Sequence, residues 1–452
     1  MTARAPARAL RAGLDRDRLT AALAAAAIAL AAAATIVIGP AALALPPAVA
    51  GTLFLVRQPL ALLALYTYVG LFKEQAVVQA VPVDVTLALG LLLGAVCAGR
   101  WLAGRARSVP LALATPVAVI GLMLVISLTW TPSPDYGSEK ALHFLTLTLL
   151  ATLAPFFLVE DERDLRRFFS WTLAIALLAA LVTIANPPEG TGRLTIGIEG
   201  NTIGASHLLC TAAVILLVGA LTELYPARRW GILAALGLIV VAAAIGSRGP
   251  LLNLGFALAA TAAIYLARVP RKLAPVALAV IAAVALIPFV SLPEGSAERL
   301  SQAARDPLGA LEADPRYTAF GQAVDLIESR PLVGVGAGGF QSVGRLTRPP
   351  EDYPHNMLLE VWAELGLVAL VALVASIAAV LAGLARRAWH LPPEPARGLM
   401  YVLVGVFVYN LLGTLLTGDL NENRTYWGSF GLAWLVVRYG IRRASPADGG
   451  RT

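Results

Sequence analysis

The chain has 452 residues, of which 58% are hydrophobic and 14% charged, and its mean hydropathy is +0.74. Soluble globular proteins carry about 25% charged residues, and a chain of this length cannot hide so much apolar surface inside a water-facing domain. A disordered chain, a collagen-like fibre and an ordinary soluble enzyme are therefore excluded. Cys97 and Cys210 lie inside apolar runs, so neither a disulfide nor a zinc site is indicated. The net charge of +7 is interpreted as a topology signal, not as a nucleic-acid-binding surface.

Apolar runs of about 20 residues predict membrane-spanning helices. We predict an all-α polytopic membrane bundle with fourteen such runs, at 19–38, 41–56, 59–72, 83–102, 109–130, 138–158, 166–186, 203–223, 229–246, 249–267, 272–291, 356–384, 397–416 and 424–440. The second and third runs are short and interrupted, so a single bent hairpin and a total of twelve is the alternative. The first run resembles a signal peptide in its arginine-rich start, but its length favours a retained anchor.

The distribution of Lys and Arg predicts the sidedness of the bundle. With a cytoplasmic N-terminus and alternating spans, 24 bases fall on the cytoplasmic side, five in short outer loops and six in one long outer loop. This imbalance is a strong positive-inside signal, and it places both termini in the cytoplasm. The predicted parts are a basic tail, an N-terminal bundle, the large outer loop, the C-terminal helices and a second tail, at 1–18, 19–291, 292–355, 356–440 and 441–452.

The outer bases need an explanation other than topology, and they are Lys73, Lys140, Arg193, Arg248 and Arg424. Arg248 stands out because the turn 246–250, Gly-Ser-Arg-Gly-Pro, is the whole connection between two apolar helices. It either reaches lipid head groups or forms an anion site in which glycines let backbone amides approach a phosphate. Arg193 lies in a Gly-rich outer loop, and Asn201 follows it before the next span.

The outer loop 292–355 is long enough to contain helices of its own. Asp314-Pro315 predicts a helix start, and Arg330-Pro331 predicts its end. The predicted apolar face consists of Tyr317, Phe320, Val324 and Ile327. Such a helix lies on the membrane or packs on the spans.

Residues 334–339 match the pattern GxGxxG, but they follow a helix rather than a strand and face away from cytosolic nucleotides, so nucleotide binding is not predicted. Flexible backbone around a lipid-linked substrate and a plain turn remain as interpretations. Asp15 and Asp17 form a DxD pattern on the cytoplasmic side, and Asp419 with Glu422 offers too few oxygen ligands for a divalent metal. We therefore predict no metal site and no cofactor.

His355 is held between a proline and the start of a predicted helix on the outer face. Glu360 and Glu364 follow at a spacing of four residues on one face of that helix, where acidic residues also favour a helix N-terminus without any further role. His143 and His207 fall inside predicted spans, which is typical of packing residues.

In this order and sidedness the pattern resembles the O-antigen ligase and O-antigen polymerase superfamily, the WaaL-type and Wzy-type membrane glycosyltransferases. The resemblance covers about 190–370. It depends on Arg193 with Asn201, on Ser247-Arg248-Gly249, on Asp314-Pro315-Arg316-Tyr317 with Pro331 to Gly336, and on His355-Asn356 with Glu360.

The resemblance implies a bundle like those of other membrane glycosyltransferases of the GT-C type, in the bacterial inner membrane, with its active site on the periplasmic face. It implies metal-independent, inverting transfer of a glycan from undecaprenyl diphosphate to lipid A–core or to another lipid-linked repeat unit. Arg193, Arg248 and His355 are then the catalytic residues. The substrate-binding residues would be Asn201, Ser247, Arg316, Asn356 and Glu360. The implied partners are the lipid-linked donor, the acceptor, membrane lipids, and a chain-length regulator or flippase.

The chemistry fits these residue types. A diphosphate leaving group needs charge stabilisation, and two guanidinium groups can bind its oxygens in place of a metal. The acceptor hydroxyl needs a base, and neighbouring arginines would favour the neutral imidazole of His355. Two other classes stay open: a flippase or exporter of lipid-linked glycans, and a non-enzymatic assembly protein of the cell envelope.

Overall fold

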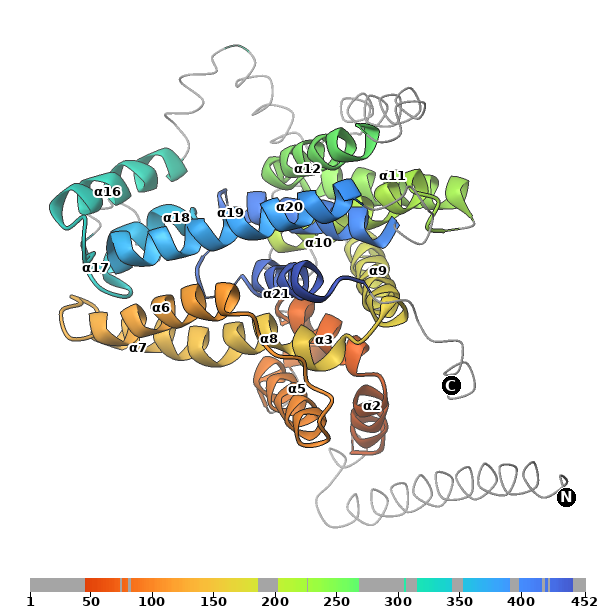
Figure 1. Cartoon of the computed structure of the whole chain (residues 1–452), viewed down its shortest axis with the longest axis horizontal. Helices are drawn as coiled ribbons and strands as arrows, with labels where there is room; N and C mark the ends of the chain where they lie inside the picture. The colour runs from red at the N-terminus through yellow and green to blue at the C-terminus, as the bar shows by residue number, and fades with distance from the viewer. Residues whose placement is uncertain are drawn as a thin grey trace, which may run out of the picture. The chain divides into compact units, whose positions relative to one another are not determined.

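The structure is a computed structural model that describes residues 45–73, 75–79, 83–185, 202–225, 227–267, 305, 315–343, 353–390, 398–416, 419–421 and 423–441 (Figure 1). The predicted spans 19–38 and 272–291 lie outside these residues. The chain divides into two compact units, residues 1–62 and 63–452. The first contributes α2 (Leu45–Arg57) and the beginning of α3 (Pro59–Tyr68). The remaining elements belong to the second unit.

The described residues of the second unit form helices and connecting turns, without a strand. After α3 the elements are η2 (Val69–Phe72), α4 (Ala76–Gln79), α5 (Val85–Leu102), α6 (Leu111–Ser127), α7 (Pro134–His143), the π-helical turn η3 (Phe144–Thr148), α8 (Leu149–Leu158), α9 (Glu162–Ala185), α10 (Thr202–Leu221), α11 (Arg228–Ile245), α12 (Arg248–Leu266), α16 (Pro315–Ser329), α17 (Gly339–Val343), α18 (Met357–Glu360), the π-helical turn η6 (Val361–Leu365), α19 (Gly366–His390), α20 (Gly398–Thr414) and α21 (Arg424–Tyr439).

Across the described ranges, seven helical segments are long and apolar enough to cross a membrane. The number becomes eight if Val49–Arg57 and Pro59–Phe72 form one broken span, which corresponds to the predicted bent hairpin. Two shorter apolar helices, α6 and α20, also coincide with the predicted spans 109–130 and 397–416. The prediction of an all-α polytopic membrane bundle is confirmed, whereas the total of twelve or fourteen spans stays a prediction.

Local capping explains why several boundaries were predictable. Asp84 begins α5, because its Oδ1 accepts the Leu87 amide at 2.9 Å. This bond, with the Lys73 ammonium 3.1 Å away, holds the pKa of the Asp84 carboxyl below its usual range. At the other kind of boundary, Gly246 ends α11 with a φ of +82°, a left-handed conformation open to glycine at no steric cost.

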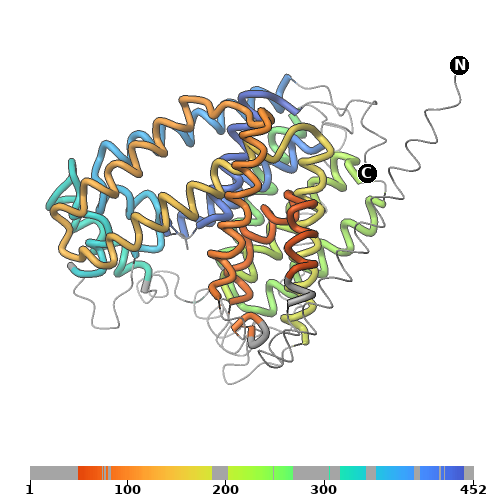
Figure 2. Tube along the Cα trace, turned by 90° about the horizontal axis from the view of Figure 1, so that it is seen from below, coloured from red at the N-terminus to blue at the C-terminus, as the bar shows by residue number. Residues whose placement is uncertain are grey.

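The helices of the second unit pack around two centres (Figures 1 and 2). The first is α10, which is the most enclosed of the seven candidate spans and is covered by α9, α11, α12 and α20. The second centre is α21, which packs along α8 and α20, while α6 lies along α19. Figure 2 shows α6, α7 and α19 side by side, with α16 and α17 at one end of them.

At one end of these helices basic side chains of several helices bind neighbouring helix ends, and we call it the basic end. The Arg100 guanidinium pairs with the Glu160 carboxylate at 3.0 Å, and Arg387 Nε donates to the Val437 carbonyl at 2.8 Å. Tyr439 donates to the Ser108 carbonyl at 2.7 Å. Five helix ends that were predicted on the same side of the membrane therefore lie together, and they belong to α5, α6, α8, α19 and α21. The opposite end is called the polar end.

The helix predicted in the outer loop is confirmed as α16, beginning at Pro315 and ending at Ser329, but its predicted apolar face is wrong in part. Tyr317 and Val324 are exposed, while Ile327 is buried as expected. The buried face is formed with Ala319, Ala323 and Leu326, which pack on Phe340 and Ala363. Small alanines give a closer approach to the neighbouring helix than the larger side chains would, and a hydrophobicity pattern alone does not register this.

The packing of α21 on α8 yields a prediction about two glycines. A Cβ added at Gly431 would overlap the Thr152 carbonyl, whereas one at Gly428 would meet its nearest neighbour at 3.8 Å, an ordinary contact. We expect Gly431→Ala to lower the thermal unfolding temperature of the purified protein in detergent, because α8 and α21 must separate, by an amount equivalent to about 1–3 kcal/mol. The matched control Gly428→Ala should unfold close to wild type. Equal effects of the two substitutions would contradict this account.

Candidate functional site

The polar end contains a cluster of three fully buried charged side chains, Lys140, Glu360 and Glu364, which we call the Lys140 cluster. The Lys140 ammonium forms ion pairs with Glu360 Oε1 and, at 2.7 Å, with Glu364 Oε2. All three side chains have 0% exposure. The Tyr136 ring lies 5.9 Å from the same ammonium. Charges inside membrane segments persist only when they are paired, and this cluster meets that condition with side chains from α7, α18 and η6.

The Gly-rich segment 334–339 closes over Glu364. The Gly338 amide donates to Glu364 Oε2 at 3.0 Å and the Phe340 amide to Oε1 at 3.4 Å. Gly334, Gly336 and Gly338 all have positive φ, and a Cβ at Gly336 would collide with Thr131. The segment is therefore a closely packed turn, and the interpretation of flexible backbone around a substrate is wrong. The glycines are needed because the backbone crosses another backbone at contact distance.

Two further segments join the cluster. The Leu420 amide donates to Glu360 Oε2 at 2.8 Å, and Thr148 Oγ1 donates to the Asn421 carbonyl. Asp419 is 6% exposed, and its Oδ1 accepts the Asn421 amide at 2.5 Å. Glu422, its suggested partner, lies outside the described residues. In the described ranges no three His, Cys, Asp or Glu side chains are grouped so that they could hold a metal ion.

His355 lies five residues before Glu360 in the chain. Its φ of +53° is unusual for a residue with a Cβ, and its ring packs against Tyr353 at 4.6 Å between centroids. Asn356 fixes the helix that follows, because its Oδ1 accepts the Leu358 amide at 3.0 Å and its Nδ2 donates to the Leu415 carbonyl at 3.1 Å. The position of His355 is thus determined by a helix cap on one side and by the end of α20 on the other.

The register of α12 on α20 gives the level of Arg248. Tyr265 packs edge-to-face on Tyr401 at 5.0 Å, and one turn earlier in α12 Thr261 lies beside Gly405. The two helices therefore run antiparallel, and the first residue of α12, Arg248, is at the level of the end of α20. This is also the level at which Asn356 binds the Leu415 carbonyl.

The other predicted site residues are distributed as follows. Ser247 precedes α12 in extended backbone. Arg316, in the first turn of α16, lies close enough to His207 of α10 for its charge to act on that imidazole. Glu360 is fully buried, with its carboxylate bound by Lys140 and the Leu420 amide. Arg193 and Asn201 lie outside the described residues. The structure thus brings the 355–356 segment and the starts of α12 and α16 to one end of the bundle.

The prediction from sequence did not identify Lys140 as a partner of Glu360 and Glu364. Lys140 was predicted to be an outer base and the two glutamates to share a helix face, but the 220 or so intervening residues conceal their contact. One signal was present: a single Lys in one apolar span and two carboxylates in another must find partners.

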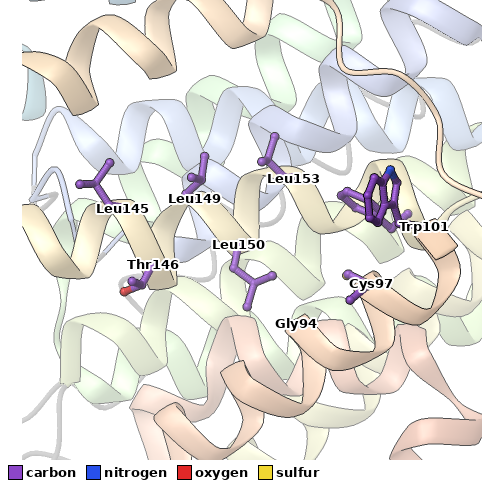
Figure 3. A pocket seen from close by; sticks show the side chains of 10 residues that line it. Gly94, Cys97, Trp101, Leu145, Thr146, Leu149, Leu150 and Leu153 are labelled. Carbon is purple, nitrogen blue, oxygen red and sulfur yellow. The ribbon is translucent and has the colours of Figure 1, made fainter.

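An apolar groove lies between α5 and the α7–α8 segment, with a volume of about 390 Å³ (Figure 3). It extends from Leu145 to Phe157 along one wall and from Gly94 to Trp101 along the other, and its only polar side chain is that of Thr146. Its Leu145 end is about one and a half turns from Lys140, and its Trp101 end is beside Arg100 at the basic end.

The Lys140 cluster leads to a stability prediction. Lys140→Met keeps the length of the side chain but leaves two buried carboxylates without a counter-charge, which costs about 3–5 kcal/mol. Lys73→Met is the matched control, because Lys73 pairs with Asp84 at 3.1 Å with about half of each side chain exposed, and such pairs contribute about 0.2–1 kcal/mol. Thermal unfolding in detergent should show a large loss for the first variant and a small one for the second. Similar losses would mean that Lys140 is not the counter-charge.

Comparison with known proteins gives one family match, and it covers part of this site. Residues 232–374 match the family model described as O-antigen ligase. The matched segment includes the turn before α12, the whole of α16 and the 334–339 turn, and it extends through His355 and Glu364 into α19. A search of curated proteins found no match. Over this segment, which is about a third of the chain, the protein is similar to the O-antigen ligase family, and the match supports the resemblance to the O-antigen ligase and O-antigen polymerase superfamily.

Proposed function

We propose that this protein transfers a glycan from undecaprenyl diphosphate to an acceptor hydroxyl at the outer face of the bacterial inner membrane, with inversion and without a metal ion. The observation that supports it best is the family match over residues 232–374 together with the shared level of His355 and the start of α12. Lipid-linked glycans and membrane lipids are the substrates and surroundings that this family implies.

In this proposal arginines bind the diphosphate and a histidine acts as the base. Arg248 and Arg193 bind the diphosphate, because guanidinium groups offer planar pairs of donors to phosphate oxygens and remain charged. His355 accepts the proton of the acceptor hydroxyl as that oxygen attacks the anomeric carbon and the diphosphate leaves. Asn201, Ser247, Arg316 and Asn356 would contact the substrates or hold these groups.

The buried charges of the Lys140 cluster hold the residues of the proposed site in position. Glu360 and Glu364 are bound by Lys140 and by backbone amides. Bound in this way, the two carboxylates keep α18, and with it His355, in a fixed position relative to α7 and to the 419–421 segment. Glu360 would then serve the substrate indirectly, through the position of His355.

The prenyl chain of the donor needs an apolar path. The groove between α5 and the α7–α8 segment is one candidate, since it begins about one and a half turns from Lys140 and is lined by apolar side chains except at Thr146 (Figure 3). A flippase would instead need an enclosed polar path through the bundle, and an assembly protein would need no convergence of the predicted site residues at one end. The enzyme interpretation is therefore preferred.

His355 provides the most direct test. With purified protein and lipid-linked donor, in excess EDTA, we expect His355→Ala to reduce transfer about 10²–10⁴-fold, the usual contribution of a positioned base, while donor binding is retained. His355→Gln should be nearly as impaired, because the amide cannot accept a proton. The matched control is His390→Ala at the basic end, which should be active. If the Gln variant is active, His355 positions the acceptor, and if EDTA abolishes wild-type transfer, the metal-free mechanism is wrong.

Arg248→Lys tests the anion site. Lysine keeps the charge but lacks the planar pair of donors, so we expect transfer to fall at least about tenfold, corresponding to about 1.4 kcal/mol, with normal membrane insertion. Arg228→Lys, at the start of α11 and predicted on the opposite side, is the control and should match wild type. Wild-type transfer by Arg248→Lys would favour the alternative that Arg248 reaches only lipid head groups.

Ligase and polymerase activities are distinguished by deletion in the native host followed by gel analysis of the glycans. Loss of long chains with one repeat unit still attached to the acceptor would indicate a polymerase. Complete chains that remain on the lipid carrier would indicate a ligase.

A further inference from the structure

The turn after α16 exposes two large apolar side chains. Leu332 is 63% exposed and Val333 is 50% exposed, and we call the segment 331–333 the Leu332 turn. Its backbone is held firmly: the Pro331 carbonyl accepts the Leu367 amide and the Trp362 indole N–H, both at 3.1 Å. The exposure of these side chains is therefore imposed by the fold.

The Leu332 turn continues an apolar surface that belongs to a membrane helix. A Cβ at Gly366, the first residue of α19, would collide with the Leu332 carbonyl. From there the exposed stripe of α19 runs through Val368 and Val371 at 60% and 56% exposure. This stripe lies opposite the buried face of α19, and the segment that contains it, Met357–His390, is a candidate membrane span. The turn thus joins the helix at the residue where its exposed apolar stripe begins.

The length of α19 indicates where the hydrocarbon layer ends. α19 has 25 residues, which corresponds to about 38 Å and exceeds the hydrocarbon thickness of about 30 Å. Measured from Arg386 at the basic end, about 20 residues bring the helix to Gly366. The Leu332 turn is packed at this position, so it lies at the boundary of the hydrocarbon layer.

Two neighbouring helices give the same level independently. α6 reaches Ser127 about 25 Å from its start at Leu111, and counting about 20 residues back from Glu160 along α8, η3 and α7 leads to Lys140. Ser127 Oγ accepts the Ala337 amide at 3.0 Å, and Lys140 binds Glu364, two residues before Gly366. Three helices thus place the 331–339 segment about 30 Å from the basic end.

We propose that the Leu332 turn is inserted into the membrane, with the side chains of Leu332 and Val333 in contact with lipid at the edge of the hydrocarbon layer. Lipid is the occupant that the surface indicates, because the turn is continuous with the lipid-facing stripe of α19 and has the same apolar character. The turn would anchor the outer loop, through α16 and the 334–339 segment, at a fixed depth. This inference does not depend on the proposed catalytic activity.

The test uses spin labels on single introduced cysteines in the full-length protein, reconstituted into vesicles of phosphatidylethanolamine and phosphatidylglycerol. The label goes on Leu332→Cys, with Val371→Cys as the lipid-facing control and Ser342→Cys, exposed on α17, as the water-facing control. Wild-type protein taken through the same labelling gives the background, since Cys97 and Cys210 are buried. Power saturation then measures contact with oxygen, which concentrates in lipid, and with a water-soluble nickel chelate.

We expect the Leu332→Cys label to behave like the Val371→Cys label, with high oxygen contact and low nickel contact. A label that matches Ser342→Cys would place the turn in water and overturn the proposal. A label shielded from both reagents would also overturn it, because the turn would then be covered by protein, either a second copy or another part of the chain. None of these outcomes depends on transfer activity, so failure here and failure of the proposed function are separate results.

Discussion

A single ammonium group, that of Lys140, is bound by carboxylates from two helical turns that lie more than 200 residues later in the chain. Glu360 connects it to the 419–421 segment and Glu364 to the Gly-rich turn. Removing one partner of a buried pair leaves an uncompensated charge that costs about 3–5 kcal/mol, so α7, the outer loop and the entrance to α19 are coupled. The polar end is organised by this interaction, because the apolar contacts elsewhere in the bundle are individually weaker and not directional.

Hydropathy predicted the helices well because burial of apolar side chains in lipid requires complete backbone hydrogen bonding within each segment. The predicted segments 83–102 and 229–246 agree closely with α5 and α11, where a capping Asp84 and a terminal Gly246 add local signals. The start of α16 at Pro315 was predictable from a local signal too, because Asp314-Pro315 is a typical helix start. Its buried face was not, because Ala319 and Ala323 allow close packing that depends on the shape of the partner surface.

The sequence allowed a prediction of which residue types form the site and at which end of the bundle they lie. It did not allow a prediction of the hydrogen bonds and ion pairs that connect them. His355 could be located between a proline and a helix start, yet its positive φ and the bond from Asn356 to the Leu415 carbonyl depend on α20, about 60 residues away. The GxGxxG segment illustrates the opposite case. Its glycines indicate flexibility when the sequence is considered alone, but in the structure they permit close backbone packing, because the missing Cβ atoms leave room for Thr131 and for the backbone carbonyl of Glu364.

The level of the Lys140 cluster also constrains where the proposed chemistry takes place. Counted from the basic end, the cluster lies about 30 Å away, at the depth where a lipid-linked diphosphate would meet the aqueous acceptor. Interactions between charges are much stronger there than in water, so unpaired carboxylates at this end would compete with an anionic substrate for any cation beside them. Lys140 binds both carboxylates, the Gly338 and Phe340 amides bind Glu364, and the Leu420 amide binds Glu360, so these carboxylates are kept from that competition. The same contacts that hold the outer loop in place would therefore leave the cations of the proposed site available to the donor.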